Sequence, residues 1–192
     1  MRFLLFTPLF LLVAACATDP AGPRLYLMEA DAPAPAGTPA QASVGLREVA
    51  LPLYARRQQI AARDAAGAIT AADEHRWAED PSRAVTRLVA RTLAALRGAP
   101  VYPDPWPQGA SPDLIATVEV DRFLGEIGGE VALDGQITLA RMSARGDPAT
   151  GGFAIRTAVV GADHAALAAA YGAALAELAR EMDRALREFE GR

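Results

Sequence analysis

The chain has 192 residues, with 19 basic and 23 acidic side chains and a formal net charge of −4 at pH 7. A mildly acidic chain without a basic run lacks the electrostatic footprint of a nucleic-acid-binding protein, so we expect no nucleic-acid partner. One cysteine and two histidines exclude an intramolecular disulfide and leave too few ligands for a Cys/His zinc site.

The first fifteen residues have the pattern of a secretory signal peptide. Arg2 is followed by an apolar stretch that ends in small residues at Ala14 and Ala15, and the stretch is too short to span a membrane. Leu12-Val13-Ala14-Ala15 before Cys16 matches the bacterial lipobox. We therefore expect residues 1–15 to be removed and Cys16 to be lipidated.

The lipid predicts where the protein resides. Lipobox cysteines generally receive a diacylglycerol and an N-acyl chain, and two or more chains anchor a protein stably. Ala17 stands where an Asp would retain the protein at the inner membrane in many Gram-negative bacteria. We therefore expect the periplasmic face of the outer membrane, with residues 16–24 as a tether. At roughly 3.3 Å per residue, the eight residues after Cys16 reach no more than about 26 Å.

Residues 25–192 are expected to form one α+β domain. Its first part has short apolar segments separated by turn residues, with a Pro/Ala-rich loop at 32–42. The predicted strands here cover 25–28, 44–51, 59–63 and 68–70, with turns at 53–57 and 64–67.

The second part contains two capped helices. Asp80 and Pro81 start a helix that Gly98 ends, and Asp163 caps a second helix over 164–189. Further strands are predicted at 101–102, 114–124, 131–139 and 153–159. Short turns between strands favour antiparallel pairing, so we expect a mostly antiparallel sheet with two helices packed on one face. Six side chains should be buried in its core: Leu88, Leu93, Leu133, Ile137, Leu175 and Leu178.

No catalytic set is apparent. Asp73-Glu74-His75 is interpreted as a solvated turn before the first helix, although an acid/base cluster is the alternative. His164 is expected at the surface, and none of the serines lies in a nucleophile-elbow motif. We therefore expect no enzyme activity, cofactor or metal.

Several motifs in chain order resemble the PqiC (YmbA-type) lipoproteins, auxiliary components of ABC/MCE lipid-transport systems. They are Leu46–Tyr54, Gln59–Arg63, Trp77–Glu79, Val118–Phe123 and Gly128–Leu133. Two positions depart from the family pattern. Proline is shifted to Pro81 with Asp80 before it, and Ile137 replaces a common tryptophan; both are interpreted as packing variations.

The resemblance implies a non-enzymatic auxiliary lipoprotein that docks an MCE tunnel to the outer membrane, with an MCE-domain protein as partner and self-association left open. The alternatives are an anchored lipid-binding module, a lipid hydrolase and a structural envelope lipoprotein. The candidate contact surface is the exposed turn that resembles the family most closely: Pro52, Tyr54, Arg56, Arg57, Gln58 and Gln59. The alternative for Tyr54 is simple packing on the sheet edge.

Overall fold

The computed structural model describes residues 22–31, 33–35, 37–143 and 147–191. The predicted signal peptide, the lipobox and Cys16 lie outside the described residues. None of the described helices is long and apolar enough to cross a membrane.

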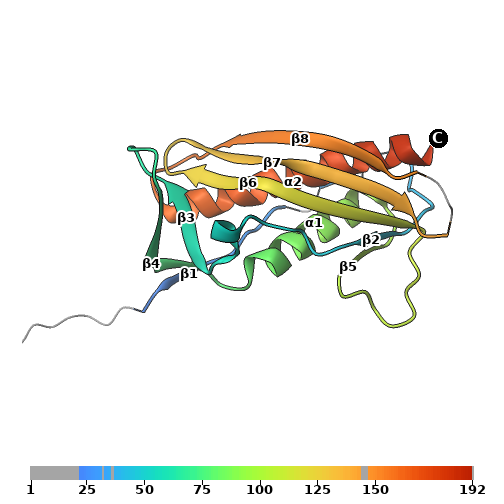
Figure 1. Ribbon diagram of the computed structural model, residues 1–192, viewed down its shortest axis with the longest axis horizontal. Helices are drawn as coiled ribbons and strands as arrows, with labels where there is room; N and C mark the ends of the chain where they lie inside the picture. Colours follow the sequence, from blue (N-terminus) through green and yellow to red (C-terminus); the bar gives the residue numbers. More distant parts are fainter. Residues whose placement is uncertain (1–21, 32, 36, 144–146, 192) are drawn as a thin grey trace, which may run out of the picture.

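The sheet is built around the long strand β6 (Leu114–Glu126) (Figure 1). On one side of β6, β7 (Glu130–Arg141) and β8 (Ala149–Ala158) continue as an antiparallel meander. On its other side the sheet divides. β2 (Val44–Leu46) pairs near the start of β6, with β5 (Val101–Pro103) outside it.

Near the end of β6 the neighbouring strand is β3 (Gln59–Arg63). Outside it lie β4 (Ile69–Trp77) and finally β1 (Arg24–Tyr26). The pairings of β2 with β5 and β6, of β3 with β6 and of β1 with β4 are parallel. The expectation of antiparallel pairing thus holds for the hairpins β3–β4, β6–β7 and β7–β8. The sheet as a whole is mixed, because its parallel pairs join strands that are separated by long connections in the chain.

Two predicted boundaries were wrong. The strand expected at 44–51 ends at Leu46; the Val49 N–H donates to the Thr86 hydroxyl (2.9 Å) of the first helix, and the chain returns to the sheet only in a single bridge at Ala50. Residues 69–77 form one strand, so Asp73-Glu74-His75 is not a turn. β3 pairs with β4 on both sides of this polar run, at Ala71 and at Arg76, and β1 pairs with it at His75, so the run is extended although its composition does not indicate a strand.

The two helices form as their capping residues predict. α1 (Pro81–Arg97) begins where the Asp80 carboxylate accepts from the Arg83 N–H (3.0 Å), and it ends at Gly98, whose φ is 61°. α2 (His164–Glu190) begins where Asp163 accepts from the Ala166 N–H (2.8 Å).

Both helices pack against each other and on the same face of the sheet (Figure 1). The predicted α+β class is therefore confirmed. All six predicted core side chains are buried: Leu88, Leu93, Leu133, Ile137, Leu175 and Leu178.

After β1 the chain runs along the helices, and we call residues 27–42 the N-terminal segment. A Cβ on Gly172 of α2 would lie 1.6 Å from the Glu29 carbonyl oxygen, so the chain crosses α2 in direct contact. Farther on, the Ala40 N–H donates to the Arg97 carbonyl (2.8 Å) and the Thr38 carbonyl accepts from Arg187 (3.3 Å). The segment therefore links the tether end of the domain to the C-terminal ends of both helices.

Candidate functional site

The predicted contact surface begins with a short 3₁₀ helix, η1 (Leu53–Arg56). Pro52, which precedes this helix, and Tyr54 within it are both half-buried. The Tyr54 hydroxyl accepts a hydrogen bond from the Phe123 N–H of β6 (3.0 Å). Tyr54 thus fastens η1 to the sheet, which leaves the neighbouring side chains to form the surface.

Three predicted residues of this surface, Arg56, Arg57 and Gln58, are exposed. Arg56 Nε donates back to the Leu51 carbonyl (2.9 Å), and Gln59 Nε2 donates to Asp73 of β4 (2.9 Å). Leu53 is 73% exposed beside them, although the sequence interpretation treated it only as a turn residue. The segment therefore presents an apolar side chain surrounded by cationic and amide groups.

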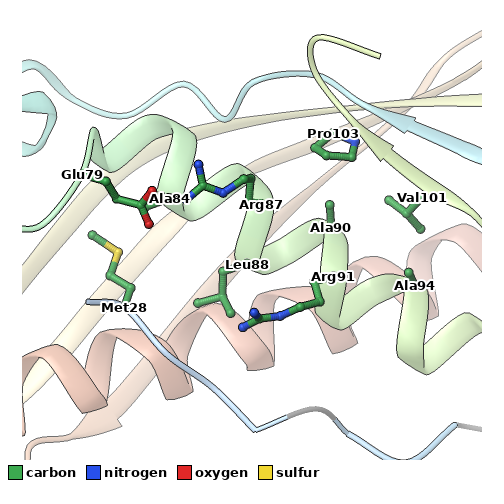
Figure 2. Close-up of a pocket in the computed structure, with 10 residues that line it drawn as sticks. All are labelled: Met28, Glu79, Ala84, Arg87, Leu88, Ala90, Arg91, Ala94, Val101 and Pro103. Atoms are coloured by element: carbon green, nitrogen blue, oxygen red, sulfur yellow. Dashed lines mark hydrogen bonds and ion pairs between the residues drawn. The ribbon is translucent and has the colours of Figure 1, made fainter. Parts of the chain in front are cut away.

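A second candidate surface follows α1 next to the N-terminal segment (Figure 2). A hollow of about 410 Å³ lies over Leu88 and three alanines of α1, bordered by Met28 and by Val101 and Pro103 of β5. Arg87, at its border, forms an ion pair with Glu79. The helix pattern alone does not reveal this hollow, because it forms only where the N-terminal segment and β5 meet α1.

A larger hollow of about 590 Å³ lies on the other side of the N-terminal segment. Ala169, Ala173 and Ala176 of α2 line it, with Glu29 and Asp31 opposite. Arg91 of α1 borders both hollows, and in the described part of the chain it has no hydrogen-bond or ion-pair partner. The first hollow, with its apolar floor beside this unpaired cation, could hold an anionic amphiphile, whereas the carboxylates of the second would repel one.

The fold brings the two histidines together. The rings of His75 and His164 stack at 3.6 Å between centroids and 6° between planes. The Tyr26 hydroxyl lies 2.9 Å from His75 Nδ1. Burial lowers the pKa of His164, and the neighbouring His75 lowers it further, whereas Asp163 acts in the opposite direction. The cluster fastens β1, and with it the tether, to β4 and to the start of α2.

This cluster of Tyr26, His75 and His164 contains no serine, threonine or cysteine. The hydroxyl of Ser43 donates to Asp113 (2.6 Å), and this bond lowers the pKa of Asp113, but neither histidine contacts the pair. Among residues 22–31, 33–35, 37–143 and 147–191, no three His, Cys, Asp or Glu side chains are grouped so that they could hold a metal ion.

Comparison with known proteins identifies the family. The model of the ABC-type transport auxiliary lipoprotein component matches residues 26–183. No curated protein sequence matches the chain at a significant level. Two crystal structures share the fold. One, of an uncharacterized protein, has a TM-score of 0.69 and 16% identity, and the match covers 86% of this chain and 99% of that one.

The other, a protein from Xanthomonas campestris, has a TM-score of 0.65 and 18% identity, and the match covers 83% of this chain and 92% of that one. Because the family model spans most of the chain, including the sheet, both hollows and the candidate contact surface, the chain belongs to the family of ABC-type transport auxiliary lipoproteins.

Proposed function

We propose that this protein is a lipid-anchored auxiliary component of an ABC/MCE lipid-transport system, and that it docks the MCE-domain protein at the periplasmic face of the outer membrane. The observation that carries the proposal is the family match over residues 26–183, which follows directly on a lipobox with its cysteine at Cys16. Ala17 after that cysteine favours the outer membrane over the inner one.

The arrangement of the domain supports a docking role. β1 starts at Arg24, eight residues after Cys16, so the tether holds this end within about 26 Å of its lipid. The C-terminus lies at the opposite end of the domain (Figure 1). A single domain on so short a tether stays close to its membrane, and a partner must bridge the remaining distance to the inner membrane.

The candidate contact surface supplies chemistry for such a partner. Exposed Leu53 offers apolar area, and Arg57 and Gln58 offer donors that can orient a polar or acidic surface. Charges at the border of an interface increase specificity and the rate of encounter more than affinity. The proposal involves no reaction, which agrees with the transport family.

The test is photo-crosslinking in intact cells that express the full chain. A photoreactive residue at Arg57 or Gln58 is expected to form an adduct with an MCE-domain protein. The same residue at Arg184, exposed on α2, serves as the control position. If no MCE-domain protein is found among these adducts, and none is recovered in a pull-down of the whole lipoprotein, the docking role is contradicted.

A lipid-binding module is the second candidate, and the unpaired Arg91 beside the two hollows favours it. A photoreactive residue at Ala94, which lines the hollow of Figure 2, would then capture phospholipid in cells. Arg91→Glu should reduce this capture, whereas Arg83→Glu, an exposed change on the same helix, should not. Equal capture by all three proteins would count against a specific lipid site.

A further inference from the structure

The outer edge of β8 is an open strand edge ten residues long. β8 pairs with β7 from Ala149 to Ala158 without a register shift, and no described strand pairs with its other side. Proteins usually protect such edges with proline, a bulge or outward charges, because an open edge readily accepts a further strand. β8 contains no proline, and its one charged residue, Arg156, is bound to Asp134 and Glu130 on the sheet face.

The hydrogen bonds of β7 and β8 show which backbone groups are open. The Val159 N–H donates to the Gly129 carbonyl (2.9 Å), so this residue directs its backbone groups toward β7. In an antiparallel pair every second residue does the same. The N–H and C=O groups of the alternate residues therefore point outward from the edge: Thr150, Gly152, Ala154, Arg156 and Ala158.

Beneath the first half of this edge lies a hollow of about 140 Å³ with an apolar and an acidic part. Its walls are Ile137 and Leu139 of β7, Phe153 of β8, and Ala185 and Phe189 of α2. Gly151 shares the inner face of β8 with Phe153, and a Cβ there would meet nothing within 4 Å. The sheet thus leaves room for one apolar side chain next to an edge that lacks its neighbouring strand.

The polar lining of the hollow is acidic. Glu181 lies 2.6 Å from Arg184 and is paired, whereas Glu188 is exposed and has no hydrogen-bond or ion-pair partner in the described ranges. A strand added beside β8 would direct every second side chain toward this face. Charge complementarity therefore favours a segment with a basic side chain on the same face as the apolar one.

We propose that the edge of β8 binds an extended segment of the transport partner as an additional strand. An apolar side chain of the segment enters the hollow under Gly151, and an Arg or Lys side chain on the same face pairs with Glu188. Main-chain hydrogen bonds would provide the affinity, and the hollow and Glu188 the specificity. The identity of the partner rests on the proposed function, whereas the binding surface rests on the edge of β8 and the hollow beneath it.

A second copy of this chain fits the edge less well. The inner-face residues of β8 are Ala149, Gly151, Phe153, Ile155 and Thr157, and none is basic. Arg156 lies on the other face, so a second β8 paired with this one would leave Glu188 without a cation. The acidic lining therefore favours a segment other than β8.

The experiment uses the full lipoprotein in intact cells with a photoreactive residue at Gly152, on the open edge. The expected adduct is a peptide of the MCE-domain protein with apolar and basic residues two positions apart. Ala154→Pro removes one outward N–H, and the adduct yield should fall about tenfold, the order expected for one lost hydrogen bond in a cooperative strand contact. Ala154→Ser keeps that N–H and should change the yield by less than about twofold.

Two further pairs of variants test the hollow and the charge. A Cβ on Gly151 meets nothing within 4 Å, so Gly151→Leu extends a larger side chain toward the hollow and should reduce the yield, whereas Gly151→Ala should not. Glu188→Arg should reduce the yield more than Glu188→Gln. Unchanged thermal unfolding of each variant shows that folding is intact. An adduct only with a second copy of the chain, or equal yields from Ala154→Pro and Ala154→Ser, would overturn the inference.

The outcomes separate this inference from the proposed function. Capture of the MCE protein by the whole chain, with no effect of the β8 variants, leaves the docking role intact and rejects the edge. A proline-sensitive adduct with a basic segment of some other protein supports the edge and rejects the MCE protein as its partner.

Discussion

Arg97 and Asp183 form an ion pair inside the protein, with 3.4 Å between Arg97 Nη1 and Asp183 Oδ1. The Arg97 side chain is fully buried at the end of α1, and its Nη2 also binds Glu190 at 2.5 Å. These contacts join the last turn of α1 to the last turns of α2. The Arg97 carbonyl accepts from Ala40, so the same residue also holds the N-terminal segment.

Removal of this arginine should strongly destabilise the domain. In Arg97→Met the buried carboxylate of Asp183 keeps only Arg187 as a partner, and breaking a buried pair typically costs about 3–5 kcal/mol. Urea unfolding measures the change. Arg184→Met removes two exposed ion pairs within α2, with Glu177 and with Glu181, and should cost no more than about 1 kcal/mol of stability. Similar decreases in the free energy of unfolding of the two variants would show that burial of Arg97 does not increase the strength of its ion pair.

Gly172 should be required for the passage of the N-terminal segment over α2. A methyl group there would overlap the Glu29 carbonyl, so in Gly172→Ala the segment or the helix must shift. Overpacking of this kind typically costs about 1–3 kcal/mol. Limited proteolysis should then cut residues 27–31 faster than in the native protein. Ala165→Ser, an exposed change in the first turn of the same helix, should leave the cleavage rate unchanged.

His164 should make stability depend on pH below neutrality. Burial and His75 lower its pKa in the folded protein below the ordinary value of 6.5. As the pH falls through 6.5, the unfolded chain binds a proton that the folded protein binds less readily, so stability decreases; above that pH this contribution is constant. The urea midpoint should therefore be lower at pH 5.5 than at pH 7.5, and His164→Gln should reduce the difference. A midpoint equally pH-dependent in the variant would assign the effect to other groups.

Cys16 should be the site of lipid attachment. Cys16→Ser removes the thiol that is alkylated, so lipid labelling should disappear and the precursor should accumulate uncleaved. Radiolabelled fatty acid and the shift in electrophoretic mobility measure both effects. Normal acyl labelling of the variant would disprove the anchor.

Ala17 should influence which membrane holds the protein. In a host that uses the Asp retention rule, Ala17→Asp should move the protein from the outer to the inner membrane fraction. Ala17→Ser is the matched control and should leave fractionation unchanged. An identical distribution of all three proteins would leave outer-membrane sorting without support.

Short-range signals in the sequence were sufficient to predict both helices and the β6–β8 meander. Asp80, Pro81 and Gly98 act on backbone groups within one turn of their own positions, as does Asp163. The alternation of apolar residues from Val131 to Leu139 likewise indicates a half-buried strand without reference to any partner. The lipobox is also local, because the enzymes that process it act on a few consecutive residues.

Long-range contacts decided the remainder. Arg97 and Asp183 are 86 positions apart, and nothing near either residue indicates the other. The strand through Asp73–His75 exists because β3 pairs with β4 on both sides of this run and β1 pairs with it at His75, while Asp73 and Glu74 stay exposed to solvent. Tyr54 reads as a member of an exposed turn, and only the position of Phe123 shows that its hydroxyl is bound.

The candidate surfaces divide in the same way. The turn at residues 52–59 can be recognised from sequence, since polar residues after a proline favour exposure. The hollow under Gly151 cannot, because α2 must pack against the β7–β8 hairpin to enclose it and a glycine carries no side chain to indicate it. By itself the sequence determined both helices, the β6–β8 meander and the family resemblance. Only tertiary packing decided which strand edges and hollows stay open, because an edge or hollow is open where no other element packs against it.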